Sequence, residues 1–343
     1  MECAAKVFIA SCSSRESVYG PVLRNMGAMS SSARVTFVDR AEEADLVLVV
    51  DMDEGGLFAN LRHNPVWRRW PEKSFGMYEG DEPPRFLHGL YSSARKAWSR
   101  RGRYLSCAYP VLRACFPSAA PPLAEVRASR KDLLFSFAGR TSYRLRRRLH
   151  HIPFPKDEVV IQDTSTYNHF DAGAKDREAA QKRYWQLAAR SKFVLCPRGA
   201  GTSSIRLFEM MEAGIAPVVI SDDWVRPLGP RWEDFALSVP ERKIARLYDI
   251  VKHCEGEFCE RGLKARQAYE EFFAPDRYWE FVLSSIEHIR HAQRMPEAVF
   301  SKALPLLVAH EWARHRAIRV SMFVRGLARA CLKSFRKKRG VSE

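Results

Sequence analysis

The chain has 343 residues, 46% of them hydrophobic, which is enough for two cores of ordinary domain size. Its 56 Lys and Arg against 40 Asp and Glu give a formal charge of +16, which favours polyanionic partners: nucleic acid, a lipid headgroup surface or phosphorylated small molecules. No stretch approaches the roughly 18 to 20 apolar residues that span a bilayer, and the start of the chain lacks a signal-peptide pattern. We therefore expect a cytoplasmic protein, soluble or peripheral on the inner face of a membrane. The eight cysteines form no CxxC pair, which favours reduced thiols over a zinc site.

Three short apolar runs open the chain, at residues 7–10, 35–38 and 46–50. Short buried strands separated by linking segments predict a parallel sheet covered by helices. Prolines then interrupt aromatic-rich segments between Asn64 and Pro122, so this part is predicted to be rich in loops.

A second block repeats the order of strand, glycine and helix. Residues 133–137 are predicted to form a strand, Gly139 a turn, and the residues from 142 onward a basic helix. An amphipathic helix over 175–190 leads into a strand at 192–196, and Gly214 is the expected C-cap of a helix that precedes a strand at 215–220. The predicted partition is two α/β domains, residues 1–125 and 126–290, and a basic helical tail, residues 291–343.

The segment CPRGAGTSSIRLFE, residues 196–209, connects a predicted strand to a predicted helix. In a parallel sheet, ligands bind beyond the carboxyl ends of the strands, where helix N-termini present unpaired N–H groups. Gly199 and Gly201 allow a sharp turn and a close approach of the backbone, and Arg198 can bind a phosphate by two hydrogen bonds. Thr202, Ser203 and Ser204 supply an N-cap hydroxyl and spare donors. The segment therefore predicts a phosphate site, with a tight turn that binds nothing as the alternative.

Arg206 and Glu209 lie three residues apart in the predicted helix, on one face. A carboxylate there could accept two hydrogen bonds from ribose hydroxyls. An intrahelical ion pair is the alternative, and the residues by themselves leave both open.

The longer stretch SKFVLCPRGAGTSSIRLFEMMEAGIAPVVISDDWVRPL resembles the nucleotide-sugar-binding block of exostosin-type glycosyltransferases. The likeness continues through WEDFALSVPERKIARLYDIV and, upstream, KDLLFSFAGR and YWQLAARSKF. It implies the GT-B architecture, in which two Rossmann-like domains face each other and the C-terminal one binds the sugar nucleotide. It also implies inversion at the anomeric carbon with no obligatory metal or other cofactor.

The resemblance implies a role for each matched residue. Arg198 and the turn after it would hold the diphosphate, Arg206 would support that charge, and Glu209 would bind the ribose. Arg140 would meet the diphosphate from the other side. The donor-binding residues expected in this way are Gly139, Arg140, Arg198, Gly199, Gly201, Ser203, Ser204, Arg206 and Glu209.

Acidic residues of the N-terminal half leave a different chemistry open. Asp51 and Asp53 form an Asp-x-Asp at a predicted strand end, which could bind a divalent cation or be a solvated strand end. Inverting transfer also uses a base that faces the donor across the cleft. The candidates for this catalytic base, which the residues do not rank, are Asp51, Asp53, Asp81 and His88.

Basic residues are concentrated in two segments, a predicted helix after Arg140 and the C-terminal tail. Arginines 144 and 146–148 follow Arg140, and one face of their helix could serve the donor or an anionic acceptor while the rest is solvated. In the tail, apolar residues recur at helical spacing between Val320 and Phe335 among basic ones, a pattern that can lie on anionic lipid or pack on the body. Aromatic stacking residues are sparse there, so nucleic acid is not expected as a partner.

The sequence therefore predicts an exostosin-like glycosyltransferase. It would transfer a sugar, with inversion, from a nucleotide diphosphate sugar to the hydroxyl of a carbohydrate or glycolipid acceptor. The expected donor is a UDP-linked sugar. The alternatives are a metal-dependent glycosyltransferase that uses Asp51 and Asp53, and a non-catalytic nucleic-acid-binding protein.

Overall fold

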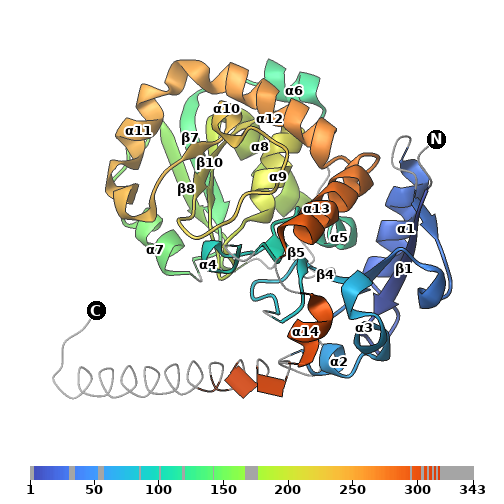
Figure 1. Cartoon of the computed structure of the whole chain (residues 1–343). Helices are drawn as coiled ribbons and strands as arrows, with labels where there is room; N and C mark the ends of the chain where they lie inside the picture. The colour runs from blue at the N-terminus through green and yellow to red at the C-terminus, as the bar shows by residue number, and fades with distance from the viewer. Residues whose placement is uncertain are drawn as a thin grey trace.

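Two α/β domains, each built on a parallel sheet, make up the computed structural model of the chain (Figure 1). The structure describes residues 4–30, 35–52, 58–84, 86–99, 102–117, 120–141, 143–166, 177–293 and 296–302, and the isolated positions 305–306, 309–310, 313 and 316.

The N-terminal sheet has the strand order β2-β1-β3-β4-β5-β6, and all its paired strands run parallel. In β3, successive side chains point to opposite faces, so Leu48 packs with α1 while Val47 packs with α2 and α3. The strands are β1 (Ala5–Ser11), β2 (Val35–Phe37), β3 (Leu46–Val50), β4 (Ser74–Tyr78), β5 (Gly89–Tyr91) and β6 (Tyr104–Leu105). The helices are α1 (Tyr19–Met29), α2 (Ala59–Arg62), α3 (Pro65–Arg69), α4 (Lys96–Ser99) and α5 (Pro110–Cys115), with 3-10 turns at Ala41–Glu43 and Pro71–Lys73.

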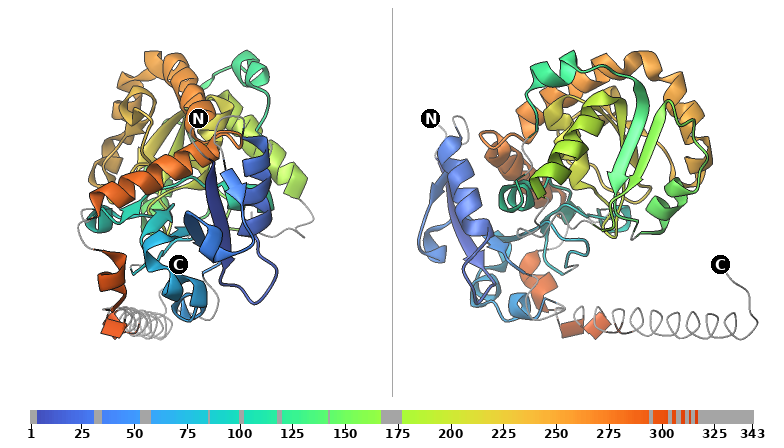
Figure 2. Two further views of the ribbon diagram at one scale, coloured as in Figure 1. Left: turned by 45° about the vertical axis from the view of Figure 1, so that its right-hand side comes forward. Right: turned by 180° about the vertical axis from the view of Figure 1, so that it is seen from behind.

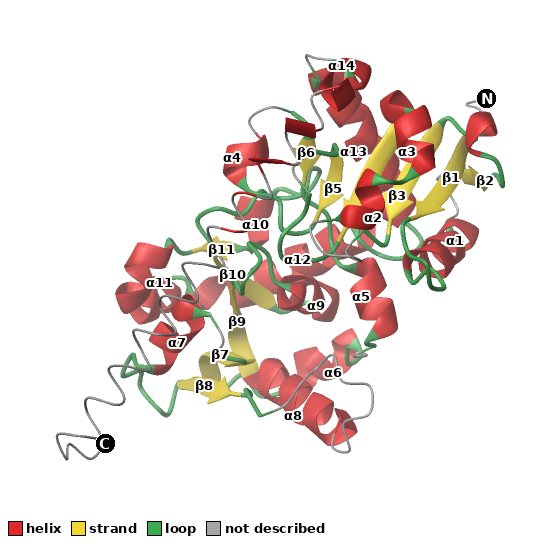
Figure 3. Ribbon diagram, turned by 90° about the horizontal axis from the view of Figure 1, so that it is seen from below, coloured by secondary structure: helices red, strands yellow, loops and turns green. Residues whose placement is uncertain are grey.

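The C-terminal sheet has the order β11-β10-β9-β7-β8 and is also parallel throughout. Helices α7 and α11 pack on one face, and α8, α9 and α12 pack on the other (Figure 3). The strands are β7 (Leu133–Gly139), β8 (Val159–Asp163), β9 (Ser191–Pro197), β10 (Ala216–Ile220) and β11 (Leu237–Ser238). The helices are α6 (Leu123–Ala128), α7 (Arg144–His150), α8 (Arg177–Arg190), α9 (Ile205–Ala213), α10 (Trp232–Phe235), α11 (Leu247–His253) and α12 (Phe258–Phe272), with 3-10 turns at Glu241–Arg246 and Glu255–Glu257.

Both sheets have the doubly wound order in which the first strand lies between the second and the third. The chain reverses direction across the sheet between β1 and β3 in one domain and between β7 and β9 in the other. Ligands of such sheets bind beyond the carboxyl ends of the strands at this reversal. In the C-terminal domain these ends are Gly139 and Pro197, directly before Arg140 and Arg198.

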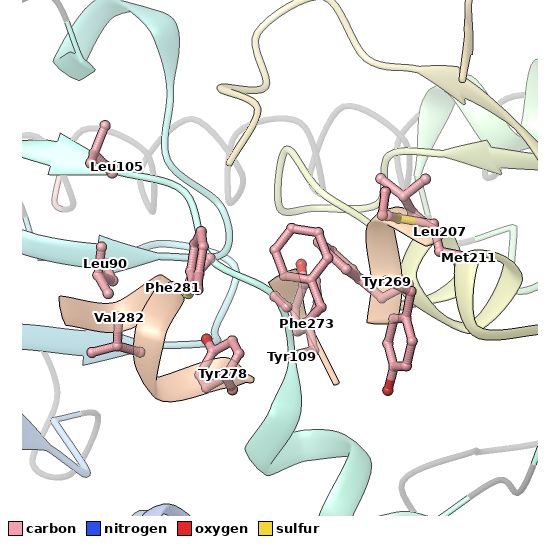
Figure 4. Packing of buried hydrophobic residues seen from close by; sticks show 14 of the residues in the cluster. Leu90, Leu105, Tyr109, Leu207, Met211, Tyr269, Phe273, Tyr278, Phe281 and Val282 are labelled. Carbon is pink, nitrogen blue, oxygen red and sulfur yellow. The ribbon is translucent and has the colours of Figure 1, made fainter. Parts of the chain in front are cut away.

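The last helices of the described chain return to the N-terminal domain. Helix α13 (Tyr278–Ala292) lies between the two sheets, and the Trp279 indole N–H donates to Leu23 O of α1 at 2.9 Å (Figures 1 and 2). One hydrophobic cluster therefore runs from β5 through α13 to α9 and α12, as Figure 4 shows for Leu90, Phe281 and Leu207. Helix α14 (Glu297–Lys302) follows on the N-terminal domain.

The predicted fold class, two facing Rossmann-like domains, is confirmed by the two parallel sheets. The three opening apolar runs form β1, β2 and β3, and Gly214 ends α9 in the left-handed region at φ +68°. The segment expected to be rich in loops also contains β4, β5 and β6, which are short and buried and so give no periodic signal. The predicted division at residue 290 falls inside α13, and residues 317–343 of the predicted tail lie outside the described residues.

Candidate functional site

The glycine turn, residues 198–204, joins β9 to α9 where the two domains meet. Ser204, one of the three hydroxyl residues expected to supply the cap, is the N-cap residue of α9, but its hydroxyl forms no capping hydrogen bond. Arg198, Ser203 and Ser204 are all buried. The turn is held to β10 by Arg198 N, which donates to Ile220 O at 3.1 Å.

Glycine is needed here for space and not for a left-handed turn. Among the described residues, Gly139, Gly199 and Gly201 are not among the glycines with positive φ. A Cβ at Gly139 would lie 2.6 Å from the Phe137 ring and 3.1 Å from Arg206 Nη2, and one at Gly199 would lie 3.3 Å from Arg146 Nη2. These two glycines therefore let guanidinium groups lie directly against the backbone.

Three arginines gather at the turn, and each uses one amino group on a backbone carbonyl. Arg146 Nη2 donates to Pro197 O at 3.1 Å, Arg198 Nη2 donates to Ala200 O at 3.2 Å, and Arg206 Nη2 donates to Ala138 O. Buried donors remain without a hydrogen-bond partner: Nε of all three residues and Nη1 of Arg206. Leaving such a donor unpaired costs about 1 to 3 kcal/mol, and more when it is charged. The cluster therefore has the donors and the charge to bind an anion.

Positive charge is concentrated in this cluster. Burial, followed by the neighbouring charge of Arg206, lowers the pKa of Arg146 to about 10. Arg146 is still protonated at neutral pH, so the site carries buried like charges that a bound anion would neutralise. The carboxylate of Glu241 lies 3.9 Å from Arg198 Nη1, at the edge of ion-pair distance.

Arg206 and Glu209 bond to different partners, although both project from α9. Arg206 lies over the Phe137 ring, 4.7 Å from its centroid, in addition to its bond to Ala138 O. Glu209 is buried and its Oε2 accepts the Tyr184 hydroxyl at 2.6 Å. Burial, followed by the charge of Glu209, raises the pKa of Tyr184 well above its usual value.

Arg140 follows the end of β7 and its side chain is exposed. Tyr143 lies three residues further on, and the Arg198 guanidinium is placed over its ring, 5.1 Å from the ring centroid. Arg140 and Arg198 therefore follow the two strands, β7 and β9, between which the chain reverses direction across the sheet.

The N-terminal domain reaches the glycine turn through two loops. Asp81, from the loop after β4, accepts the Gly201 N–H on Oδ1 at 2.9 Å. Ala94, after β5, accepts the Thr202 hydroxyl at 3.1 Å. Tyr109 is buried beside Ser203, and burial raises its pKa to about 12. The carboxyl ends of strands from both sheets thus face each other across this turn.

Two of the other candidate bases, Asp51 and His88, have their contacts away from the turn. The Asp51 carboxylate accepts hydrogen bonds from Ser11 Oγ at 2.8 Å, Ser17 Oγ at 2.6 Å and Val18 N at 3.3 Å, at the start of α1. His88 is buried, with Nε2 2.7 Å from Ser74 O and its ring stacked on another aromatic side chain. Asp53 lies outside the described residues.

Two groups that the sequence did not single out belong to this region. Arg146 stood among four arginines of one predicted helix, and only the packing of α7 on β7 and β9 separates it from its exposed neighbours. Glu79, at the end of β4, is buried and accepts the N–H groups of Val111 at 3.0 Å and Leu112 at 2.8 Å. Burial raises the pKa of Glu79 to about 8. It fixes the start of α5, next to Tyr109.

Two kinds of feature are absent from the described residues. Within those residues, no group of three His, Cys, Asp or Glu side chains is arranged to hold a metal ion. In the same part of the chain, none of the helices combines the length and the apolar character that crossing a membrane requires.

The glycine turn lies in a segment that is similar to a known protein family. Residues 107–254 match the family described as "Exostosin GT47 domain". The chain is 32% identical over 114 residues to the exostosin-1 homolog of Caenorhabditis elegans, covering 31% of this chain and 30% of that protein. It is 24% identical over 247 residues to exostosin-1 of Drosophila melanogaster, covering 66% and 30%. It is 42% identical over 72 residues to the probable glucuronoxylan glucuronosyltransferase IRX7 of Arabidopsis thaliana, covering 20% and 16%.

The chain spans less than a third of the length of these relatives. The matched segment nevertheless contains β7, α7, the whole glycine turn and α9, with Arg146, Arg198, Arg206 and Glu209. Residues 107–254, which hold these groups, are therefore similar to the exostosin GT47 domain.

Proposed function

We propose that the protein transfers a sugar, with inversion, from a nucleotide diphosphate donor to a hydroxyl of a carbohydrate or glycolipid. The observation that supports this most is the set of buried, unpaired guanidinium donors of Arg146, Arg198 and Arg206 around the glycine turn. A diphosphate has the acceptor oxygens and the negative charge that these groups need. The proposed donor is UDP-linked, and the name of the Arabidopsis relative makes UDP-glucuronic acid the first to test.

We assign each part of the donor to named groups. The diphosphate would lie against the turn and the three arginines, with Arg140 closing the other side. Their positive charge would stabilise the negative charge that develops on the leaving group in the transition state. Tyr184 occupies one carboxylate oxygen of Glu209, and we assign the other, Oε1, to a ribose hydroxyl.

Asp81 is the base that we assign, because it is the described candidate whose carboxylate reaches the turn. In the proposed step, Asp81 takes the proton of the acceptor hydroxyl, and that oxygen forms a bond to the anomeric carbon. The bond between the anomeric carbon and the phosphate oxygen breaks, and its electron pair leaves with the nucleotide diphosphate.

Binding of UDP, measured by titration calorimetry, tests the donor site. Arg146→Ala removes a buried charged donor, so we expect it to weaken UDP binding ten- to a hundredfold, from roughly 1.5 to 3 kcal/mol for a hydrogen bond to a charged group. The control is Arg148→Ala, which makes the same charge change at an exposed position of α7 and should alter affinity less than twofold. Equal UDP affinity in a folded Arg146→Ala protein would contradict the proposal.

We further propose that the reaction does not depend on a metal ion. The arginine cluster offers the charge that a cation supplies elsewhere, so we propose a transfer that persists in the presence of a chelator. Loss of donor turnover on chelation would favour the metal-dependent alternative.

We also propose a cytoplasmic location, with the basic tail against anionic lipid on the inner face of a membrane and no nucleic acid as partner.

A further inference from the structure

One carboxylate of the N-terminal domain lies on the glycine turn itself. Asp81 Oδ1 accepts the Gly201 N–H at 2.9 Å, and the Asp81 side chain is exposed. A Cβ at position 201 would lie 2.6 Å from this oxygen, so only glycine lets the carboxylate reach the backbone here. An acid thus occupies an N–H group of the turn to which we assign the diphosphate.

The same carboxylate faces the arginine cluster. Its negative charge raises the pKa of Arg146, against the larger lowering that burial causes. A phosphate oxygen and a carboxylate oxygen seek the same N–H group and the same cation. The Gly201 N–H and the Arg146 cation cannot bind the phosphate and the carboxylate at the same time, because two negative charges at that distance repel each other.

The contact is not needed to join the two domains. Val225 N donates to Ala94 O at 3.2 Å, and Lys96 N donates to Asp223 O at 3.0 Å. The Thr202 hydroxyl is also bonded to Ala94 O across the same interface. These bonds would persist if the bond between Asp81 and Gly201 were broken, so an exposed side chain is free to leave the turn.

Building on the proposed function, we infer that Asp81 holds the position of a phosphate oxygen until the donor binds, and that the donor displaces it. The Gly201 N–H then donates to the diphosphate, and the charge of Arg146 interacts with the diphosphate. The released carboxylate turns to the acceptor side of the cleft, where it serves as the base. The base therefore becomes available only in the donor complex, and the donor binds before the acceptor.

The experiment measures the affinity of the full chain for UDP and for uridine by titration calorimetry. Asp81→Asn removes the competing charge, so we expect UDP to bind at least fivefold more tightly. Uridine carries no phosphate, and its affinity should stay within twofold. Asp81→Ala, which also removes the acceptor oxygens, should behave in the same way and serves as the second variant.

Glu82→Gln is the matched control, because it makes an equal charge change at the next exposed position of the same loop. Its UDP affinity should stay within twofold of the wild type. The inference is overturned if Asp81→Asn binds UDP equally or more weakly, if uridine tightens as much as UDP, or if the control tightens as much. Arg146→Ala separates this result from the proposed function: if it still weakens UDP binding, the donor site stands and only the role of Asp81 is lost.

Discussion

Gly214 and Gly262 face each other where α9 packs on α12. Gly214 has φ +68°, a conformation that favours glycine, and ends α9. Gly262 lies inside α12, where a glycine weakens a helix, yet a Cβ there would lie 2.3 Å from Gly214 O. The close approach of the two backbones therefore depends on Gly262, and it keeps α9, with Arg206 and Glu209, against the body of the domain.

At this residue scale we expect Gly262→Ala to lower the free energy of unfolding. The added methyl group meets a backbone atom that cannot rotate away, and overpacking of this kind costs about 1 to 3 kcal/mol. Gly256→Ala is the control, because nothing lies within 4 Å of its added Cβ. Urea unfolding should show a change within about 0.5 kcal/mol for the control, as for an ordinary surface substitution. Equal stability of both variants would contradict the packing argument.

Among the secondary-structure elements, α14 is bound to the N-terminal domain by charge. Glu297 is fully buried and accepts two hydrogen bonds from Arg103, at 2.5 and 2.8 Å. The Phe300 ring lies 3.6 Å from the Arg103 guanidinium, and His88 Nδ1 is 3.6 Å from Glu297 Oε2. Burial lowers the pKa of His88. His88 is thus part of the attachment of α14, at a distance from the glycine turn.

Breaking this ion pair should destabilise the protein strongly. Glu297→Gln leaves the buried charge of Arg103 without a counter-ion, and such losses are about 3 to 5 kcal/mol. Lys302→Gln, at an exposed position of the same helix, is the control and should be nearly neutral. The free energy of unfolding, measured in urea, checks both. A loss below about 1 kcal/mol for Glu297→Gln would show that the pair is dispensable.

For the molecule as a whole, the two domains share one hydrophobic cluster and enclose the glycine turn between them. Helix α13 carries apolar side chains that pack toward both sheets, so the chain crosses to the C-terminal domain and then returns (Figure 4). The turn belongs to the C-terminal domain, but Asp81 and Ala94 of the N-terminal domain complete its hydrogen bonds. The candidate site is therefore a property of both domains together.

The basic tail is the other feature at this scale. Deleting residues 325–343 removes seven Lys and Arg, each of which can contribute about 1 kcal/mol near an anionic surface. We expect the deletion to lower sedimentation with phosphatidylserine vesicles while UDP binding stays within twofold. Vesicles of phosphatidylcholine alone are the control for charge. Unchanged sedimentation, or loss of the fold on deletion, would favour packing of the tail on the body.

The sequence by itself determined the α/β class, the strands at residues 46–50 and 133–137, and the C-cap at Gly214. These depend on local rules: apolar runs of strand length, and the conformation that glycine tolerates. The order of CPRGAGTSSIRLFE also indicated an anion site after a strand, since Arg198 and the glycines stand next to each other in the chain.

Only the tertiary structure decided which distant groups meet there. Arg146 could not be separated from Arg144, Arg147 or Arg148 by composition, because its role depends on which face of α7 packs on the sheet. Asp81 and Asp51 are both acids after buried strands, yet one reaches the glycine turn and the other is surrounded by hydroxyl donors at α1. Contacts of this kind join residues far apart in sequence, and they follow from how two separately folded sheets are packed, which no local pattern records.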